Sequence, residues 1–147
     1  MKRKQFIKTC GLACLCSSAS LSLLLESCAN TTYFAKSEES DKYLSLKKSE
    51  FTQTVKNKQT ERTFVLIKSD KFNFPICVSR TNDQTYCAVL LECTHKSCEL
   101  RPQGNLLICP CHGSEFTNTG IVQNPPAEEN LKTFIIKTDH DTIYIFF

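Results

Sequence analysis

Three features of the sequence predict an all-β domain. Beyond residue 50 the chain consists of short segments rich in β-branched and aromatic residues, which favour strands. Turn-forming residues separate these segments. The periodicity of an amphipathic helix is hard to find in the same region. The chain has 147 residues. Without a leader, roughly 120 remain, which suits one domain with its own core.

The expected strands follow one another at short intervals. In order, they are FTQTV at 51–55, TFVLI at 63–67, FPICVS at 74–79, TYCAVLL at 85–91, LLIC at 106–109, LKTFIIK at 131–137 and TIYIFF at 142–147. Pairs such as Ser69-Asp70 and Pro125-Pro126 lie between them as turn material. Short strands joined by turns predict a sandwich or an open barrel of antiparallel sheets.

Composition excludes several classes of function. The net charge of +3 is too small and too evenly spread to indicate nucleic-acid binding, so we expect no nucleic-acid partner. Only four glycines occur, and no glycine-rich loop for a nucleotide is visible. Ten cysteines are far above ordinary usage, and they indicate disulfides, metal ligands or leader cysteines.

Residues 1–28 have the layout of an export leader. A basic start precedes an apolar stretch at about 11–25, which is short for a membrane span, although an uncleaved anchor stays an alternative. The stretch Leu25-Glu26-Ser27-Cys28 resembles a bacterial lipobox, in which Cys28 would be acylated after cleavage. Arg3-Lys4 with the following residues resembles an imperfect twin-arginine signal. Residues 29–50 are largely Ser, Thr, Lys and Glu, and they predict a flexible tether before a domain at 51–147.

Two compact clusters of cysteine and histidine carry the chemistry. They are CTHKSC at 93–98 and CPCHGS at 109–114. Cys93 with His95, and Cys109 with His112, are spaced so that each loop can turn two side chains toward one point. Two thiolates and two imidazoles can bind a tetrahedral zinc ion. The same four groups can bind a [2Fe–2S] cluster with both thiolates on one iron and both imidazoles on the other.

These two boxes resemble those of the Rieske [2Fe–2S] proteins, specifically the disulfide-bearing kind found in quinol:cytochrome c oxidoreductases. The resemblance covers about residues 72–147 and implies a two-loop cluster-binding subdomain. It implies one cluster per chain, held by Cys93, His95, Cys109 and His112. It also implies a disulfide between Cys98 and Cys111, and a hydrogen bond from Ser114 to a cluster sulfide. Structural zinc remains the competing interpretation.

The chain departs from that family at three places. Phe116 stands where high-potential members carry a tyrosine that donates a hydrogen bond, so we expect a lower potential. Lys96-Ser97 replaces the apolar Leu-Gly tip of respiratory-complex members, which argues against their mode of docking. Asn124-Pro125-Pro126-Ala127 resembles the loop that covers the cluster, without its usual glycine.

The remaining cysteines and histidine are expected to be structural. A two-residue turn at Asn82-Asp83 would place Cys77 and Cys87 on opposite faces of a hairpin, unless a bulge brings them together for a second disulfide. We expect free thiols in preference to that bond. His140, between Asp139 and Asp141, is expected to be a solvated turn residue and not a ligand.

Together these features predict a one-electron carrier in a bacterial cell-envelope electron-transfer chain, anchored to the membrane and facing the exterior. No constellation of residues supplies a nucleophile or a general base, so the domain is not expected to be a stand-alone catalyst. The expected donor is a quinol or a membrane redox subunit, and the expected acceptor is a cytochrome or another redox protein. The alternatives are the iron–sulfur subunit of a bc-type complex and a zinc-stabilised binding module.

Overall fold

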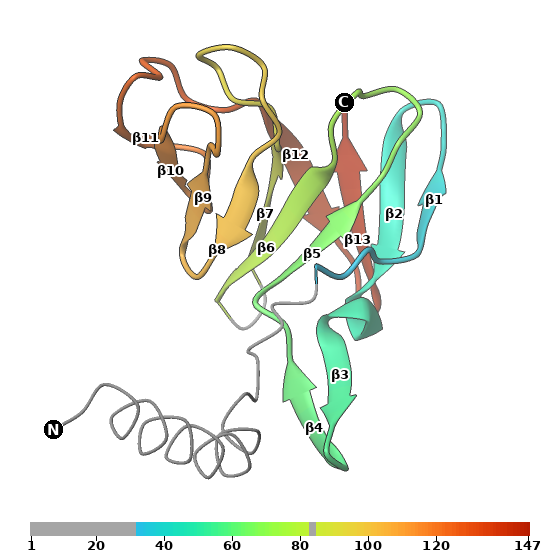
Figure 1. The fold of residues 1–147 in the computed structure, drawn as a ribbon. Coiled ribbons are helices and arrows are strands. Elements are labelled where there is room, and N and C mark those ends of the chain that lie inside the picture. Colours follow the sequence, from blue (N-terminus) through green and yellow to red (C-terminus); the bar gives the residue numbers. More distant parts are fainter. Residues whose placement is uncertain (1–31, 83–84) are drawn as a thin grey trace, which may run out of the picture. The chain divides into compact units, whose positions relative to one another are not determined.

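The computed structural model describes residues 32–82 and 85–147, and this part of the chain is all-β, as predicted (Figure 1). Its elements are β1 (Ser37–Glu39), β2 (Tyr43–Lys47), the short 3₁₀ helix η1 (Lys48–Phe51), β3 (Thr52–Val55), β4 (Lys58–Glu61), β5 (Phe64–Ile67), β6 (Ile76–Asn82), β7 (Thr85–Leu90), β8 (Arg101–Gln103), β9 (Leu106–Ile108), β10 (Glu115–Thr117), β11 (Val122–Asn124), β12 (Thr133–Thr138) and β13 (Thr142–Phe146). Each of the seven predicted segments overlaps one of these strands, and β6 and β12 extend beyond the predicted ends.

The largest sheet has seven antiparallel strands in the order β1-β2-β13-β12-β7-β6-β5. Its two edges are connected by the segment at residues 33–39. At one end of this segment, β1 pairs with β2, and at the other end Phe34 bridges Leu66 on the outer edge of β5. Two backbone hydrogen bonds join this segment to β5. The N–H of Ala35 donates to the carbonyl of Leu66 (2.8 Å), and the N–H of Leu66 donates to the carbonyl of Tyr33 (2.9 Å). The sheet therefore curls into a near-barrel with no long exposed edge here.

The prediction of a flexible tether through residue 50 is wrong for the described part of that segment. Tyr43–Lys47 forms β2, which pairs along its whole length with β13. Leu44 and Leu46 alternate with polar residues and are buried in the barrel core. The physical reason is that a five-residue strand with two leucines among polar neighbours has the composition of a polar linker, and only its pairing with β13 distinguishes the two.

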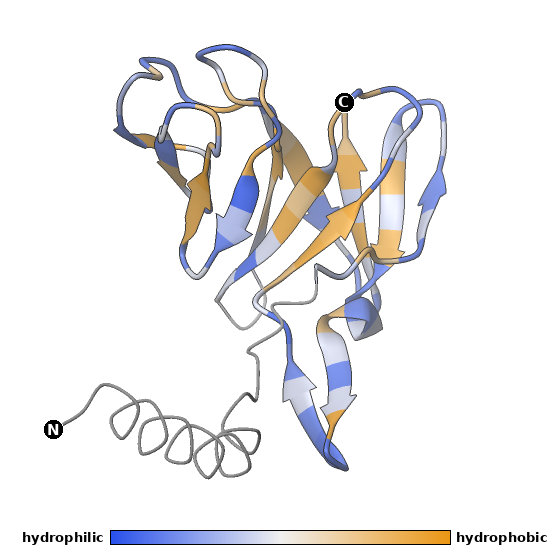
Figure 2. Ribbon diagram, viewed as in Figure 1, coloured by the Kyte–Doolittle hydropathy of each residue, from blue (hydrophilic) through white to orange (hydrophobic). Residues whose placement is uncertain are grey.

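A smaller sheet with the order β11-β10-β9-β8 packs against the barrel and carries the two cysteine–histidine loops (Figure 1). A second hydrophobic cluster joins the two parts. From the barrel it takes Leu66, Cys77 and Val89, and from the smaller sheet it includes Leu107 and Phe116. In Figure 2 apolar residues follow β9 on this sheet and the barrel strands that face it, while the loops above are mostly polar. The shared core holds the loops against the barrel.

The β6–β7 hairpin differs from the predicted register. Cys77 lies opposite Val89 and Ser79 opposite Cys87, because an irregularity between Arg80 and Asn82 shifts the pairing. Cys77 and Cys87 therefore share one face of the sheet, and the prediction of opposite faces is wrong. Both are free thiols, as expected. Burial raises the pKa of Cys77 to about 12, so this thiol stays protonated at neutral pH.

Candidate metal centre

The first box forms a tight loop between β7 and β8, closed by backbone hydrogen bonds. The N–H of Cys93 donates to the carbonyl of Cys98 (2.9 Å), and the N–H of Ser97 donates to the carbonyl of Cys93 (2.8 Å). Ser97 adopts a left-handed conformation (φ 50°), which L-residues rarely take. The loop thus reverses the chain within five residues, and from it His95 and Cys98 reach side chains of the second box.

The second box, between β9 and β10, repeats this backbone pattern. The N–H of Cys109 donates to the carbonyl of Ser114 (2.8 Å), and the N–H of Gly113 donates to the carbonyl of Cys109 (3.0 Å). Gly113 takes the left-handed conformation (φ 80°) at the position equivalent to Ser97. The two loops are therefore built alike, and each begins with a buried cysteine, at 1% exposure in both cases.

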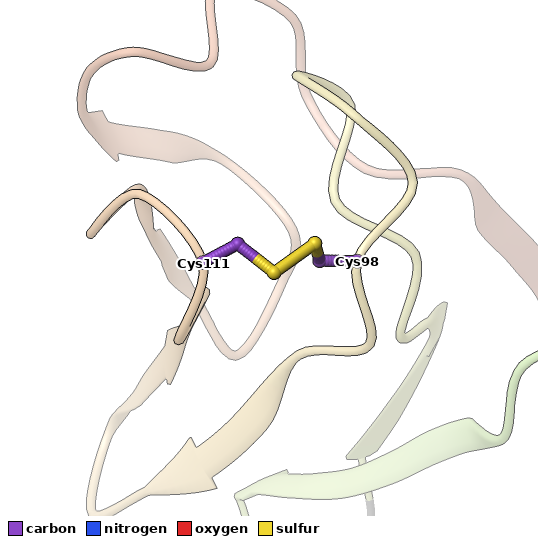
Figure 3. Close-up of a disulfide and its surroundings, with 2 residues drawn as sticks. All are labelled: Cys98 and Cys111. Atoms are coloured by element: carbon purple, nitrogen blue, oxygen red, sulfur yellow. A yellow bond between two sulfur atoms is a disulfide. The ribbon is translucent and has the colours of Figure 1, made fainter.

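The disulfide between Cys98 and Cys111 links the two loops, as the family resemblance implied (Figure 3). Its two Cα atoms are 6.5 Å apart. The sulfur of Cys109 lies within 4.8 Å of both disulfide sulfurs. Because those two sulfurs are bonded to each other, we do not assign this trio as a metal site. It shows instead that the covalent link runs directly beside one of the predicted ligands.

The four predicted ligand side chains gather at the same end of the smaller sheet. The imidazole rings of His95 and His112 face each other edge to face with centroids 4.9 Å apart. The thiols of Cys93 and Cys109 are close enough to interact: burial raises the pKa of the Cys93 thiol, and the neighbouring Cys109 thiol raises it further. The two loops thus bring the two thiols together and the two imidazoles together, and these are the donor types that an iron–sulfur cluster with mixed ligation needs.

One buried nitrogen atom indicates that these four side chains bind a metal group. Among the described residues, Nδ1 of His95 is buried and has no hydrogen-bond partner in the protein. A buried nitrogen without a partner costs about 1–3 kcal/mol, so native proteins rarely leave one. Coordination by a metal ion satisfies such an atom. The residues present therefore fit the [2Fe–2S] group that the sequence predicted.

A third loop, at residues 125–131, is hydrogen-bonded to both boxes. The backbone N–H of Ala127 donates to Oγ of the fully buried Ser114 (3.0 Å), which belongs to the second box. Oγ1 of Thr94, in the first box, donates to the carbonyl of Glu129 (2.8 Å). Because Ser114 accepts one hydrogen bond from the loop, its own hydroxyl proton is available for another acceptor.

Sequence reasoning missed the part played by Thr94 and Glu129. Thr94 stands inside the first box, yet nothing in the sequence indicates that its hydroxyl reaches a carbonyl 35 positions further along the chain. The signal that was present is the neighbouring pair Pro125-Pro126, which predicts a turn.

Two of the departures from the family pattern, Phe116 and Lys96-Ser97, have clear positions. Phe116 is fully buried in the second hydrophobic cluster, where its ring has no hydroxyl to offer. Lys96 and Ser97 are exposed at the turn of the first loop. His140 lies elsewhere, in the turn between β12 and β13, where it is exposed and hydrogen-bonded to Asp141. It is a turn residue, as expected.

The leader predictions lie outside the described residues. Cys28 and the apolar stretch before it belong to residues 1–31, which the structure does not describe. Within residues 32–82 and 85–147, no helix has the length and apolar character needed to span a bilayer.

Comparison with known proteins agrees with the geometry. The sequence model of the Rieske [2Fe–2S] domain matches residues 43–135, which is well over half of the chain. The cytochrome b6-f complex iron–sulfur subunit of Prochlorococcus marinus (strain MIT 9303) is 34% identical over 55 residues, covering 36% of this chain and 31% of the relative. That of Trichodesmium erythraeum (strain IMS101) is 49% identical over 41 residues, covering 26% of this chain and 23% of the relative. The chain thus spans less than a third of the length of these curated relatives.

A solved structure aligns with a larger share of this chain than these sequence relatives do. The plasma membrane Rieske protein PetC3 of the cyanobacterium Synechocystis PCC 6803 aligns with a TM-score of 0.51 and 29% sequence identity. The alignment covers 56% of this chain and 85% of that protein.

Proposed function

This chain belongs to the Rieske [2Fe–2S] family, and on that premise we propose that it carries single electrons in a bacterial cell envelope, held at the membrane and facing the oxidising side. That it is a Rieske-type iron–sulfur electron carrier follows from the family. The location, the ligand assignment and the partners are the proposal. The observation that carries the ligand assignment is the buried, unpartnered Nδ1 of His95, whose ring lies against that of His112.

Cys93 and Cys109 would hold one iron, and His95 and His112 the other. A bound cluster of this type takes up and releases one electron. The cysteines are suited to the inner iron because both are buried against apolar side chains that exclude water. The histidines are suited to the outer iron because His95 is half-buried and His112 is exposed.

The histidines also give the site a way to hold protons. Each neutral imidazole has two ring nitrogens, and coordination uses one of them. For His95 the buried Nδ1 is the suitable ligand atom, which leaves Nε2 free to bind a proton. The exposed ring of His112 has direct access to solvent for the same purpose. This arrangement favours a quinol, which releases protons with its electrons, as the donor.

The loop at residues 125–131 and the disulfide hold the site in one geometry. The hydrogen bonds to Ser114 and from Thr94 attach the loop to both boxes. The Ser114 hydroxyl proton would then point to a cluster sulfide, which raises the reduction potential. Disulfides persist in oxidising compartments, so the Cys98–Cys111 bond supports a location outside the cytoplasm.

A second candidate is the iron–sulfur subunit of a bc-type quinol:cytochrome c oxidoreductase. The matches to cytochrome b6-f iron–sulfur subunits favour it. The charged Lys96 at the exposed tip argues against it, because docking a lysine on an apolar membrane subunit carries a desolvation cost. The third candidate is a binding module stabilised by zinc. The measurement described next distinguishes it from an iron–sulfur protein.

The test is EPR spectroscopy with iron, sulfide and zinc analysis on the full chain, produced so that the disulfide forms. We expect two irons per chain and a reduced-state signal of mixed nitrogen and sulfur ligation. His112→Ala should abolish that signal, while His140→Ala, which removes an exposed turn histidine, should leave it unchanged. A colourless protein with one zinc, even after anaerobic reconstitution, would refute the proposal.

A further inference from the structure

The β3–β4 hairpin stands away from the barrel, at the opposite end from the cluster loops (Figure 1). Its strands pair only over Thr52–Val55 and Lys58–Glu61, and nearly all their residues are exposed. A two-stranded ribbon of this kind is marginally stable in water by itself. Lys56 and Asn57 are both left-handed (φ 49° and 62°), which defines a tight turn between the strands.

The outer part of this hairpin carries only positive charge. Its sequence from residue 52 to residue 60 is TQTVKNKQT, with two lysines and no acidic residue. The exposed side chain of Val55 adds an apolar group beside Lys56 and Lys58. At the base the charges change: Glu61 pairs with Arg80 on β6. The tip therefore presents a small cationic and apolar surface.

The base of the hairpin adjoins the place where the chain joins the barrel. The hydroxyl of Tyr33 donates to Glu50 just before β3 (2.7 Å), and the guanidinium of Arg62 just after β4 lies 3.8 Å from the Tyr33 ring centroid. Arg62 also donates to the carbonyl of Thr52 (2.8 Å). The first described residues are thus attached to the hairpin, and the predicted leader precedes them directly in the chain.

This attachment limits how far the domain can lie from a membrane anchor. The apolar stretch ends near residue 25, and the six residues 26–31 span at most about 20 Å when fully extended. The hairpin extends about 13 Å from its base, at about 3.3 Å per residue over four residues. A leader held in a bilayer therefore brings the hairpin tip within reach of that surface.

We propose that the Lys56–Lys58 tip of the β3–β4 hairpin docks on the anionic headgroups of the membrane that holds the leader. The domain would then be held at the membrane at two places, through the short connection to the leader and through the docked hairpin tip. These two contacts hold the opposite, cluster-bearing end away from the lipid, where an extrinsic redox protein can reach it. This inference rests on the membrane anchoring in the proposed function.

Hydrogen exchange tests the proposal on the full chain in lipid nanodiscs, with and without phosphatidylglycerol in phosphatidylcholine. We expect the amides of residues 52–61 to exchange about ten- to thirty-fold more slowly with the anionic lipid, because each lysine near such a surface adds about five-fold in affinity. The Lys56→Gln/Lys58→Gln variant should lose this protection, and so should wild type at high salt. The control Lys42→Gln/Lys137→Gln removes two exposed lysines elsewhere and should retain it.

Each other outcome overturns the inference in a recognisable way. Equal exchange in both lipids, with the chain bound to the nanodiscs, refutes the docking and leaves the anchoring intact. Protection that survives the hairpin variant shows that another surface binds. Failure of the full chain to bind nanodiscs removes the anchoring as well, while the EPR signal of the same sample still decides the cluster assignment.

Discussion

The two loops have a left-handed residue at equivalent positions, and substitutions at these two positions should change the stability of the protein in opposite directions. Ser97 and Gly113 occupy equivalent positions, with φ of 50° and 80°. A non-glycine residue pays about 1–2 kcal/mol for this conformation, and glycine loses roughly 0.5–1 kcal/mol more backbone entropy on folding. Ser97→Gly should therefore stabilise the protein by about 0.5–1 kcal/mol. Gly113→Ala should destabilise it by a similar amount.

The structure removes a steric contribution from the glycine change. A Cβ atom built on Gly113 meets no atom within 4 Å, so the expected loss is conformational. The assay is the apparent melting temperature of the full chain, followed by circular dichroism and by loss of cluster absorbance. The shifts should be a few degrees, upward for Ser97→Gly and downward for Gly113→Ala.

Ser97→Ala serves as the control, because it removes the hydroxyl and keeps a Cβ atom at the left-handed position. We expect little change in melting temperature for this variant. If Ser97→Gly lowers the melting temperature, or if Ser97→Ala raises it as much as glycine does, the reasoning from backbone conformation is wrong.

Three further predictions concern the same loops and one distant turn. Cys98→Ser/Cys111→Ser opens a loop with a sequence separation of 13 and should cost about 3 kcal/mol, seen as a lower melting temperature that reducing agent does not change further. Ser114→Ala leaves the Ala127 N–H without its acceptor and should cost about 1–3 kcal/mol, with a lower reduction potential in a redox titration; an unchanged potential would contradict the assigned hydroxyl role. Hydrogen bonds from the Tyr144 hydroxyl and from backbone N–H groups hold the pKa of Asp139 below its usual 3.8. The ionised carboxylate therefore stabilises the fold fully above pH 3.8, and this stabilisation is lost as the pH falls below that value. Asp139→Asn should flatten the acid side of a stability–pH profile, and an unchanged profile would refute this.

The predictable part of the site was local in sequence. The boxes at 93–98 and 109–114 contain every proposed ligand and both disulfide cysteines. Each loop closes on itself through hydrogen bonds within five residues, so its shape depends mainly on residues inside the box. Strands such as β5 and β13 were also predictable, since continuous β-branched and aromatic residues have few alternatives to a buried strand.

The unpredicted strands are short or polar. β8 and β10 have three residues each, too few to show a period, and they form because neighbours in the smaller sheet supply their hydrogen bonds. The register of Cys77 and Cys87 depended on one irregularity near the β6–β7 turn, which moves a side chain to the other face. Composition carries no information about such a shift.

By itself, the sequence determined the class of the fold and the family, and it supplied the proposed donor residues of the metal centre, because these depend on residue types at short spacing. Tertiary structure alone decided how the loop at 125–131 is attached to Thr94 and Ser114. It also decided that residues 33–39 close the barrel beside the hairpin instead of forming a free tether. The physical reason is the same in both cases: these contacts join residues far apart in the chain, and only the packed barrel and smaller sheet bring their hydrogen-bonding groups together.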